Sequence, residues 1–157
     1  MVRLGKLTDY GLVLMTCMGR ESGAYRTARD LAIESTLPLS TVSKLLKELQ
    51  QGGLLSSHRG TKGGYVLARP AHEISVVDMI AAIEGPMALT ECSTDVIGLC
   101  TIESCCPMKN NQRVINQAVR GVLERIMLSD LIHPLQLTTI KDARGRLVPT
   151  IASGRIQ

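Results

Sequence analysis

Four of the five cysteines in this 157-residue chain lie within one short stretch, ECSTDVIGLCTIESCCP, residues 91–107. They are Cys92, Cys100, Cys105 and Cys106, and the stretch contains no lysine or arginine. Thiolates are soft donors that bind zinc and iron-sulphur clusters, and accessible thiols can also form disulfides. In a reducing cytosol, clustered cysteines are more often metal ligands or redox-active thiols than structural disulfides. The sequence therefore indicates metal or redox chemistry in this segment.

The spacing of these cysteines favours an iron-sulphur cluster over zinc. The pattern is Cys92-x7-Cys100-x4-Cys105-Cys106, without the short Cys-x2-4-Cys pairs that are usual in structural zinc sites. Three separated thiols that lack a fourth ligand suit a cluster whose last ligand comes from elsewhere, such as a partner subunit. Zinc remains an alternative. A thiol switch, in which Cys100 forms a disulfide with Cys105 or Cys106, is another.

The N-terminal third of the chain has the pattern of a helix-turn-helix. Residues 6–20 carry apolar side chains at helical spacing, and Cys17 on that stripe is predicted to be a buried core residue. Thr27 and Asp30 have the spacing of a capping box at the start of a second helix. Ser40 is predicted to cap a third helix. The buried stripe of the third helix is Val42, Leu45, Leu46 and Leu49. Two short helices joined by a tight turn place the second one in the DNA major groove.

A β-hairpin is predicted directly after the third helix. The segments LLSSH and YVLAR are predicted strands, and RGTKGG between them supplies two cations and three glycines. Glycines allow close approach of the main chain to a phosphate backbone, and the cations favour a groove of negative potential. This basic wing favours DNA binding over a winged helix used only for protein contacts. The predicted DNA-contacting residues are Ser40, Thr41, Ser43, Lys44 and Lys47 on the helix and Arg59, Thr61, Lys62 and Gly63 on the wing.

The rest of the chain divides into a helix, the cysteine loop, a long helix and a tail. Ser75 and Asp78 have capping-box spacing before a helix that ends at Gly85. Pro107 opens an apolar-striped segment of about twenty residues, roughly 30 Å as a helix. We expect this helix to cross a partner subunit, with packing on its own domain as the alternative. The expected fold is mainly α with a small β-hairpin wing. Its parts are a winged helix-turn-helix domain (1–85), a cysteine-rich cluster-binding loop (86–107), a dimerisation helix and following segment (108–135) and a flexible basic tail (136–157).

The distribution of charge indicates a polyanionic partner. Residues 1–70 and 108–157 have an excess of lysine and arginine, whereas residues 71–107 contain acidic residues and no basic ones. No stretch of 18 apolar residues occurs, and no cleavage site follows the first apolar run, so we expect a cytoplasmic protein without a membrane partner. We do not expect an enzyme, since the sequence contains no catalytic constellation and no phosphate-binding glycine loop before a helix.

The motifs quoted above resemble one family of regulators. The segments LTDYGL, LPLSTVSKLLKELQQGGLLSSHRGTKGGY and the cysteine loop followed by a long helix are similar to the IscR/NsrR-type winged-helix iron-sulphur regulators. The resemblance covers most of residues 1–135. EGPMALTECS and ESCCP resemble in particular the branch that regulates the SUF iron-sulphur assembly operon. The resemblance implies a homodimer, a cluster held by three loop cysteines in each subunit, and a DNA affinity set by the state of the cluster.

The resemblance also implies roles for single residues. The matching cluster ligands are Cys92, Cys100 and Cys106. Cys105 is the alternative to Cys106, because a second adjacent thiol is not expected in the family. Asp9 matches the acidic residue that supplies a fourth ligand from the partner subunit in NsrR-type members, although it could equally be a carboxylate that stabilises a helix N-terminus. The implied base or groove contacts are Ser40, Lys44 and Arg59. The first cysteine spacing is longer than in IscR and NsrR, and PMKNNQ lacks the histidine that IscR-type members use. Asp9, Cys105 and a thiol from outside the loop are therefore the alternative fourth ligands.

The sequence therefore predicts a homodimeric repressor that binds double-stranded DNA under the control of an iron-sulphur cluster. A 2Fe-2S cluster is expected, with 4Fe-4S as the alternative, and SUF-type assembly genes are the expected targets. A cluster that bridges the loop of one subunit and the first helix of the other would set the spacing of the two recognition helices, because half-sites lie roughly 34 Å apart. The alternatives are a cluster-independent thiol-redox regulator, a zinc-stabilised regulator and, from another class, an iron-sulphur carrier.

Overall fold

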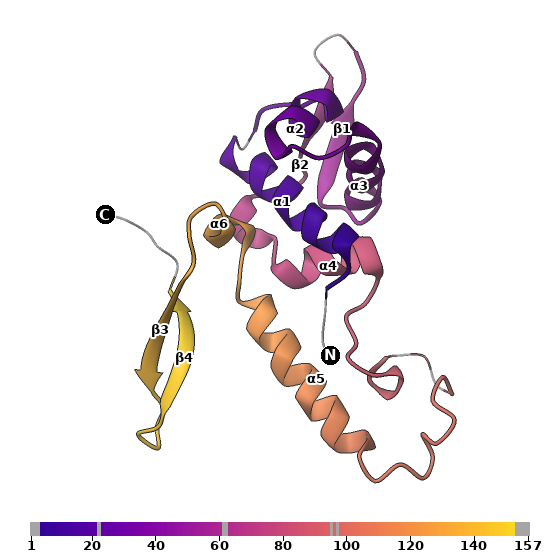
Figure 1. Ribbon diagram of the computed structural model, residues 1–157, viewed down its shortest axis with the longest axis vertical. Coiled ribbons are helices and arrows are strands. Elements are labelled where there is room, and N and C mark those ends of the chain that lie inside the picture. Colours follow the sequence, from indigo (N-terminus) through magenta and orange to yellow (C-terminus); the bar gives the residue numbers. More distant parts are fainter. Residues whose placement is uncertain (1–3, 22, 61–62, 95, 97, 153–157) are drawn as a thin grey trace.

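The computed structural model describes residues 4–21, 23–60, 63–94, 96 and 98–152. Figure 1 shows a head of helices that carries a β-hairpin wing, and an extension made of the cysteine loop, a long helix and a second hairpin. The helical elements are α1 (Lys6–Arg20), α2 (Ala28–Ser35), α3 (Leu39–Gln51), η1 (Ala71–Glu73), α4 (Val76–Glu84), η2 (Glu91–Ser93), α5 (Lys109–Glu124) and α6 (Leu128–Leu131). The strands are β1 (Leu55–His58), β2 (Gly64–Leu67), β3 (Gln136–Lys141) and β4 (Leu147–Ala152). The expected fold class, mainly helical with an antiparallel wing, is confirmed.

Side-chain caps begin two helices of the head as the sequence predicts. At α2, the Asp30 amide donates to Thr27 Oγ1 over 3.2 Å, and the Thr27 amide donates to the Asp30 carboxylate over 3.4 Å. At α4, the Ser75 and Asp78 pair makes the same two bonds, at 3.1 and 3.0 Å. These reciprocal bonds satisfy amides that have no partner inside the helix. α4 ends at Glu84, and its C-cap is Gly85, whose φ of 87° lies in the left-handed region that favours glycine.

The start of α3 differs from the prediction. Ser40 does not cap this helix, because α3 begins at Leu39 and Pro38 occupies the N-cap position. The Val42 amide already donates to the Pro38 carbonyl over 3.0 Å. Proline suits a helix start, since its ring fixes φ and it has no amide that would need a partner. Ser40 consequently lies in the first turn with an exposed side chain.

An aliphatic core holds the head together, as expected for a chain without phenylalanine or tryptophan. Its fully buried side chains come from five helices and from two positions between elements: Leu14, Met15 and Met18 of α1, Leu31 of α2, Val42, Leu45, Leu46 and Leu49 of α3, Met79 of α4, Leu128 of α6, and Leu54 and Ile74. Cys17 is 5% exposed and belongs to this core, which confirms its predicted role. α1 therefore packs against both the helix-turn-helix and the part of the chain that leads to the cysteines.

The extension is closed where it returns to the head. The Val76 amide donates to the Ile126 carbonyl over 2.9 Å, and the Leu128 amide donates to the Ile74 carbonyl over 2.7 Å. α5, which precedes this bridge, has 16 residues rather than the predicted twenty or so, and is about 24 Å long. It is shorter because Met108, not Pro107, is its N-cap, and because the bridge requires extended backbone soon after Glu124.

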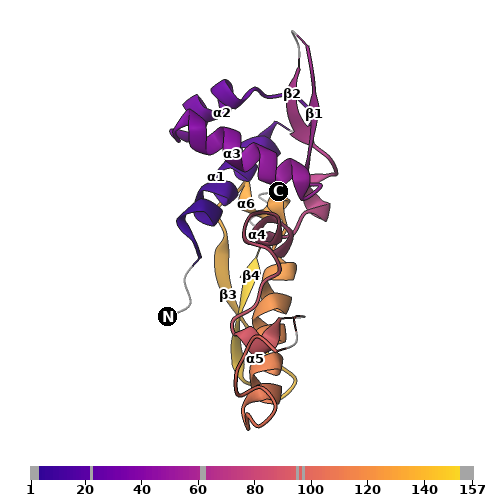
Figure 2. The ribbon, with the colours of Figure 1, turned by 90° about the vertical axis from the view of Figure 1, so that its right-hand side faces the viewer.

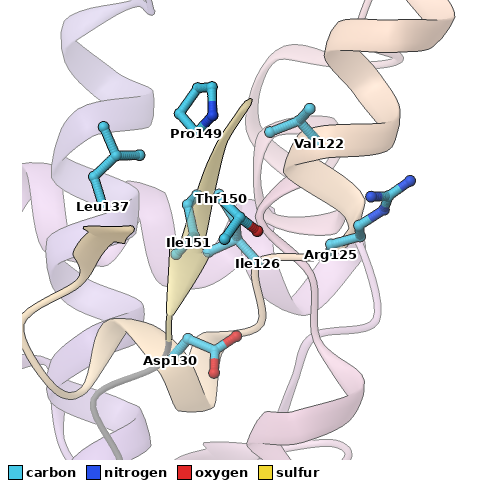
Figure 3. Close-up of a pocket in the computed structure, with 8 residues that line it drawn as sticks. All are labelled: Val122, Arg125, Ile126, Asp130, Leu137, Pro149, Thr150 and Ile151. Atoms are coloured by element: carbon cyan, nitrogen blue, oxygen red, sulfur yellow. The ribbon is translucent and has the colours of Figure 1, made fainter. Parts of the chain in front are cut away.

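A second hairpin follows α6, within the segment for which the sequence predicts a flexible basic tail. β3 and β4 pair antiparallel from Gln136↔Ala152 to Lys141↔Leu147, so residues 136–152 of that segment have regular structure. The turn is stabilised by the Asp142 carboxylate, which accepts from the amides of Arg144 and Arg146 over 2.8 and 2.9 Å. A cavity of about 450 Å³ separates this hairpin from the end of α5 (Figure 3). It is lined by Val122, Arg125, Ile126 and Asp130 on one side and by Leu137, Pro149, Thr150 and Ile151 on the other.

Two glycine-to-alanine substitutions should have opposite effects on stability. Gly64 has a φ of +154°, and a Cβ there would lie 2.5 Å from the Arg26 carbonyl oxygen, so Gly64→Ala should reduce the free energy of unfolding by about 1–3 kcal/mol. Gly121, inside α5, has open space where a Cβ would be placed, and Gly121→Ala should raise it by about 0.5–1 kcal/mol. Urea unfolding of both variants measures this. Equal stabilities for Gly64→Ala and the wild type would contradict the close approach.

Candidate nucleic-acid interface and cysteine loop

α3 has one buried and one exposed face. Its inner side chains, Val42, Leu45, Leu46 and Leu49, are all 0% exposed. On the outer face Ser40, Ser43, Lys44 and Lys47 are exposed and Thr41 is half-buried. Lys44 Nζ lies 3.7 Å from Glu48 Oε1, a long ion pair that leaves the lysine side chain 62% exposed. The structure therefore brings the residues predicted on this helix onto one accessible polar surface that matches the shape of a major-groove reader.

The wing extends beyond α2 and α3, as Figure 2 shows. Its strands pair from Leu55↔Leu67 to His58↔Gly64. Arg59 follows β1 directly and is exposed, while a Cβ on Gly63 would lie 2.2 Å from the His58 carbonyl oxygen. Only glycine fits that position, which explains the glycine pair seen in the sequence. The predicted contacts Thr61 and Lys62 lie outside the described residues.

A backbone bridge anchors the wing to the helix-turn-helix. The Arg26 amide donates to the Tyr65 carbonyl and the Tyr65 amide donates to the Arg26 carbonyl, both over 2.8 Å. The Arg26 side chain is 13% exposed and forms ion pairs with Glu34 and, at 3.0 Å, with Glu21. The wing and α2 are therefore held by the same residue, which fixes the wing relative to the helix-turn-helix.

The thiol of Cys17 lies beside this ion-pair cluster. Burial raises the pKa of Cys17, and the nearby Glu34 carboxylate raises the pKa further by its charge. Both effects favour the neutral thiol, because burial and a neighbouring negative charge each disfavour the thiolate. Cys17 is therefore separate, in chemistry and in position, from the cysteines of the loop.

The loop cysteines differ in exposure. All five cysteines are free thiols; Cys92 is buried, Cys100 and Cys106 are half-buried and Cys105 is exposed. Within the described part of the chain, no three His, Cys, Asp or Glu side chains gather closely enough to hold a metal ion. The donor set fits an iron-sulphur cluster by type, since such clusters are held by thiolates, and the loop has little regular structure besides η2 to restrict it.

Side chains of α5 hold the cysteine loop against the helix. Asn116, 7% exposed, accepts from the Leu89 amide over 3.0 Å. Arg113 Nε donates to the carbonyl of Cys92 over 3.2 Å. Figures 1 and 2 both show the loop running beside α5. The buried asparagine is satisfied by the loop backbone, so the helix and the start of the loop form one packed unit.

A carboxylate within the loop organises its middle. Glu103 accepts from the Gly98 amide over 3.1 Å and lies 3.0 Å from Lys109 Nζ on α5. The Gly98 hydrogen bond and then Lys109 hold the pKa of Glu103 below its ordinary value. A carboxylate with a lowered pKa stabilises this arrangement above its unfolded pKa, and the contribution is lost as the pH falls through its folded pKa. The loop, which has no cation of its own, is therefore balanced by those of α5.

Asp9 lies at the base of the loop. Its side chain is exposed in the first turn of α1, next to the fully buried Thr8. The hydroxyl of Thr8 donates to Glu84, and the Gly5 amide donates to the same carboxylate oxygen over 3.0 Å. Glu84 is the last residue of α4, so this carboxylate joins the start of α1 to the point where the loop leaves the head. Among the described residues, Asp9 and the cysteines do not form a group of three or more side chains that could hold a metal ion.

The sequence does not identify three residues that hold the cysteine loop in place: Glu84, Asn116 and Arg113. Their partners are distant in the chain or are backbone atoms, and neither kind of contact leaves a recognisable pattern in the nearby sequence. One signal was available for Asn116, which is a polar residue next to the apolar stripe of the long helix. A polar residue there indicates a buried hydrogen bond only after the loop is known to cover it.

Comparison with known proteins identifies the family. The Rrf2 family, described as iron-dependent transcriptional regulators, matches residues 4–134. The chain belongs to the Rrf2 family. The HTH-type transcriptional regulator IscR of Salmonella paratyphi B is 28% identical over 157 residues, covering 97% of this chain and 94% of its own. CymR, the global cysteine regulator of B. subtilis, has a similar structure with a TM-score of 0.66 and 28% identity, over 84% of this chain and 97% of that one. An IscR of T. potens shares the fold, with a TM-score of 0.64 and 23% identity, over 83% of this chain and 86% of that one.

Family membership gives meaning to the exposed face of α3 and to the wing. This Rrf2 protein is a transcriptional regulator that binds DNA and is not an enzyme, as predicted. The resemblance to IscR-type regulators is confirmed. The described helices include none that is both long and apolar enough to span a membrane. The match to the family ends before β3, so the second hairpin lies outside the part that defines it.

The five thiols should differ in their rate of alkylation. Reaction requires an accessible thiolate, and the pKa of Cys17 is raised by burial and Glu34, so Cys17 should react with iodoacetamide at pH 8 at least about tenfold more slowly than exposed Cys105. Peptide mass spectrometry of the reduced, metal-free protein measures each rate. Unfolding in urea should remove the difference, which controls for intrinsic reactivity. Equal rates in the folded protein would show that Cys17 is not part of the core.

Proposed function

We propose that this Rrf2 protein is a homodimeric transcriptional repressor whose affinity for DNA is controlled by an iron-sulphur cluster in the cysteine loop. The observation that carries the proposal is the presence of two chemically different surfaces in one chain. A polar recognition helix and wing lie at one end, and a loop with four free thiols lies beside α5 away from them (Figure 1). The match to a family of iron-dependent regulators supports the proposal.

The proposed ligands are Cys92, Cys100 and Cys106, with Cys105 as the alternative to Cys106. Asp9 of the partner subunit is the proposed fourth ligand, because the Asp9 side chain is exposed in the first turn of α1, near the point where the loop leaves the head. Among the described residues of its own chain, Asp9 does not belong to a group of side chains that could hold a metal ion. When bound, a 2Fe-2S cluster would supply a redox-active centre that iron shortage or oxidants remove. The half-buried position of Cys106 favours it over Cys105, since shielding from solvent protects a cluster.

Dimerisation is supported by an apolar stripe on α5 that the described residues of the chain leave largely exposed. Ile115, Val119 and Val122 follow at helical spacing and are 45%, 36% and 54% exposed. A monomeric protein rarely leaves such a stripe in water, and two copies related by a two-fold axis would bury it. A dimer would also present two recognition helices to two half-sites.

The proposed control passes through two structural connections. Glu84 joins the base of the loop to the start of α1, and the bridge between Val76 and Ile126 joins the end of α5 to the start of α4. A change in the loop therefore acts on elements that pack under α3. The state of the loop can act as a switch only if its two states differ in their affinity for DNA. A coupling free energy of about 1–3 kcal/mol between the loop and the DNA surface corresponds to a change in that affinity of about 5- to 150-fold.

The proposed target genes are those of SUF-type iron-sulphur assembly. The support is the similarity of EGPMALTECS and ESCCP to that branch of IscR-type regulators. Repression of assembly genes by a protein that itself carries a cluster would form a feedback loop between cluster assembly and the synthesis of the assembly proteins.

A cluster-independent thiol switch is the second candidate. It is favoured by the likeness to CymR, described as a global cysteine regulator, and by the exposure of Cys105 next to Cys106. This candidate predicts a reversible disulfide and no iron. A zinc-stabilised regulator would instead contain zinc in both redox states.

Anaerobic purification followed by iron, sulphide and zinc analysis should separate these candidates. We expect iron and sulphide in comparable amounts in the wild type, loss of both in Cys92→Ala and loss in Cys106→Ala but not in Cys105→Ala, because thiolates hold the cluster. Cys17→Ala is the matched control and should retain iron, since Cys17 lies in the core of the head. A colourless wild type without iron after anaerobic reconstitution would reject the cluster, and a disulfide or bound zinc would then identify the alternative.

Substitutions on the recognition helix and wing should weaken DNA binding. Lys44→Ala and Arg59→Ala should each reduce affinity for a duplex of about 30 base pairs and lower the salt slope by about 1, since each removes one cation that neutralises phosphate. Lys141→Ala is the control, because this exposed lysine lies in the second hairpin, away from the wing (Figure 1). Fluorescence anisotropy at several salt concentrations measures both quantities. Equal effects of Lys141→Ala and Lys44→Ala would contradict the proposed interface.

A further inference from the structure

The first two turns of α5 supply two cations to a loop that has none. Lys109 Nζ lies 3.0 Å from Glu103 Oε1, and Arg113 Nη2 lies 3.9 Å from the same oxygen. Arg113 Nε also donates to the Cys92 carbonyl oxygen over 3.2 Å. Arg113 therefore contacts both the first cysteine and the acidic residue that lies between Cys100 and Cys105.

The contacts of Glu103 show that this arrangement is more than an exposed ion pair. The Glu103 side chain is only 12% exposed, and its second oxygen accepts from the Gly98 amide over 3.1 Å. A carboxylate withdrawn from water to this extent is stable when cations and donors surround it. The middle of the loop is thus folded around Glu103, and Glu103 is held on α5 by Lys109 and Arg113.

We propose that Arg113 is a positioning residue for the cysteine loop: it fixes Cys92 and the Glu103 segment on α5 and so sets how firmly the loop holds its bound group. This proposal rests on the proposed function where it concerns an iron-sulphur cluster. The tether itself does not require the cluster, since both contacts exist in the chain alone.

The geometry of arginine suits this role better than that of lysine. The guanidinium presents Nε and Nη2 in a rigid plane, so Arg113 can donate to a carbonyl and face a carboxylate at the same time. A lysine has one ammonium and would satisfy only one of the two. Arg113→Lys therefore keeps the charge and loses the link between the two loop segments, whereas Arg113→Gln loses the charge as well.

α5 also provides a matched control. Arg120 is two turns further along, its side chain is 50% exposed against 49% for Arg113, and it forms an ion pair with Glu124 within the same helix. Arg120→Gln removes the same charge from the same helix without touching a described loop residue.

The test measures the rate at which Cys92 is alkylated in the reduced, metal-free, full-length protein. Cys92 is 8% exposed, so iodoacetamide reaches it mainly after local opening of the loop. In Arg113→Gln the reaction should be roughly three- to tenfold faster, as expected for loss of a partly solvated charged hydrogen bond. Arg113→Lys should be intermediate, while Arg120→Gln should match the wild type. Alkylation of Cys17, in the core of the head, should be the same in all four proteins and reports that the fold is intact.

The second measurement is the rate at which the protein releases iron to a chelator, monitored by visible circular dichroism. Arg113→Gln should lose the visible signal several times faster than the wild type and Arg120→Gln. Unchanged alkylation of Cys92 in Arg113→Gln, or equal acceleration in Arg120→Gln, would overturn the positioning role even if the wild type holds iron. A third outcome separates the two proposals. If Cys92 is alkylated faster in Arg113→Gln but not in Arg120→Gln, and the wild-type protein binds no iron, the positioning role of Arg113 is supported and the iron-sulphur cluster of the proposed function is rejected.

Discussion

Two backbone hydrogen bonds, between Ile74–Val76 and Ile126–Leu128, close the middle of the chain into a loop that leaves the head and returns to it. The segment between these bonds contains α4, which packs in the core of the head, followed by the cysteine loop and α5 of the extension. Because these bonds are made by backbone atoms beside the buried side chains of Ile74 and Leu128, they are shielded from water. The orientation of α5 relative to the head is therefore set by the core at its C-terminal end and not by the cysteine loop.

This closure explains how one small chain can separate two kinds of chemistry. The cations proposed to contact DNA belong to the head, whereas the four loop thiols lie on the extension, where the local charge is acidic apart from the cations of α5. Glu84 then links the start of the loop to α1, which packs under α3. A short path of contacts thus joins the cysteine loop to the surface that is proposed to bind DNA.

The head could be predicted closely from the sequence, because its signals are local. The capping boxes at Thr27 and Ser75, the stripe of α3 and the glycine-rich wing each depend on residues a few positions apart. Ser40 was misplaced as a cap because Pro38 can begin a helix without side-chain help. The second hairpin was missed because its turn at Asp142 is marked only by short polar bonds, and its strands alternate weakly. The contacts of Asn116 and Arg113 could not be predicted, because they join α5 to the cysteine loop. These two segments lie side by side only in the folded chain.

The anchoring of the wing has a consequence for the DNA sequences this protein selects. Arg26 and Tyr65 tie β2 to the segment before α2, and at Gly64 a Cβ would lie 2.5 Å from the Arg26 carbonyl oxygen, so the two segments cannot move closer together. Within one protomer, the distance between the major-groove reader and the wing is therefore set by the fold. For the proposed homodimer, the two DNA half-sites should share a single internal spacing between the bases that α3 is proposed to read and the groove that the wing is proposed to enter. Variation in operator length would then fall in the spacer between the half-sites, within the range over which the two proposed protomers can shift relative to one another.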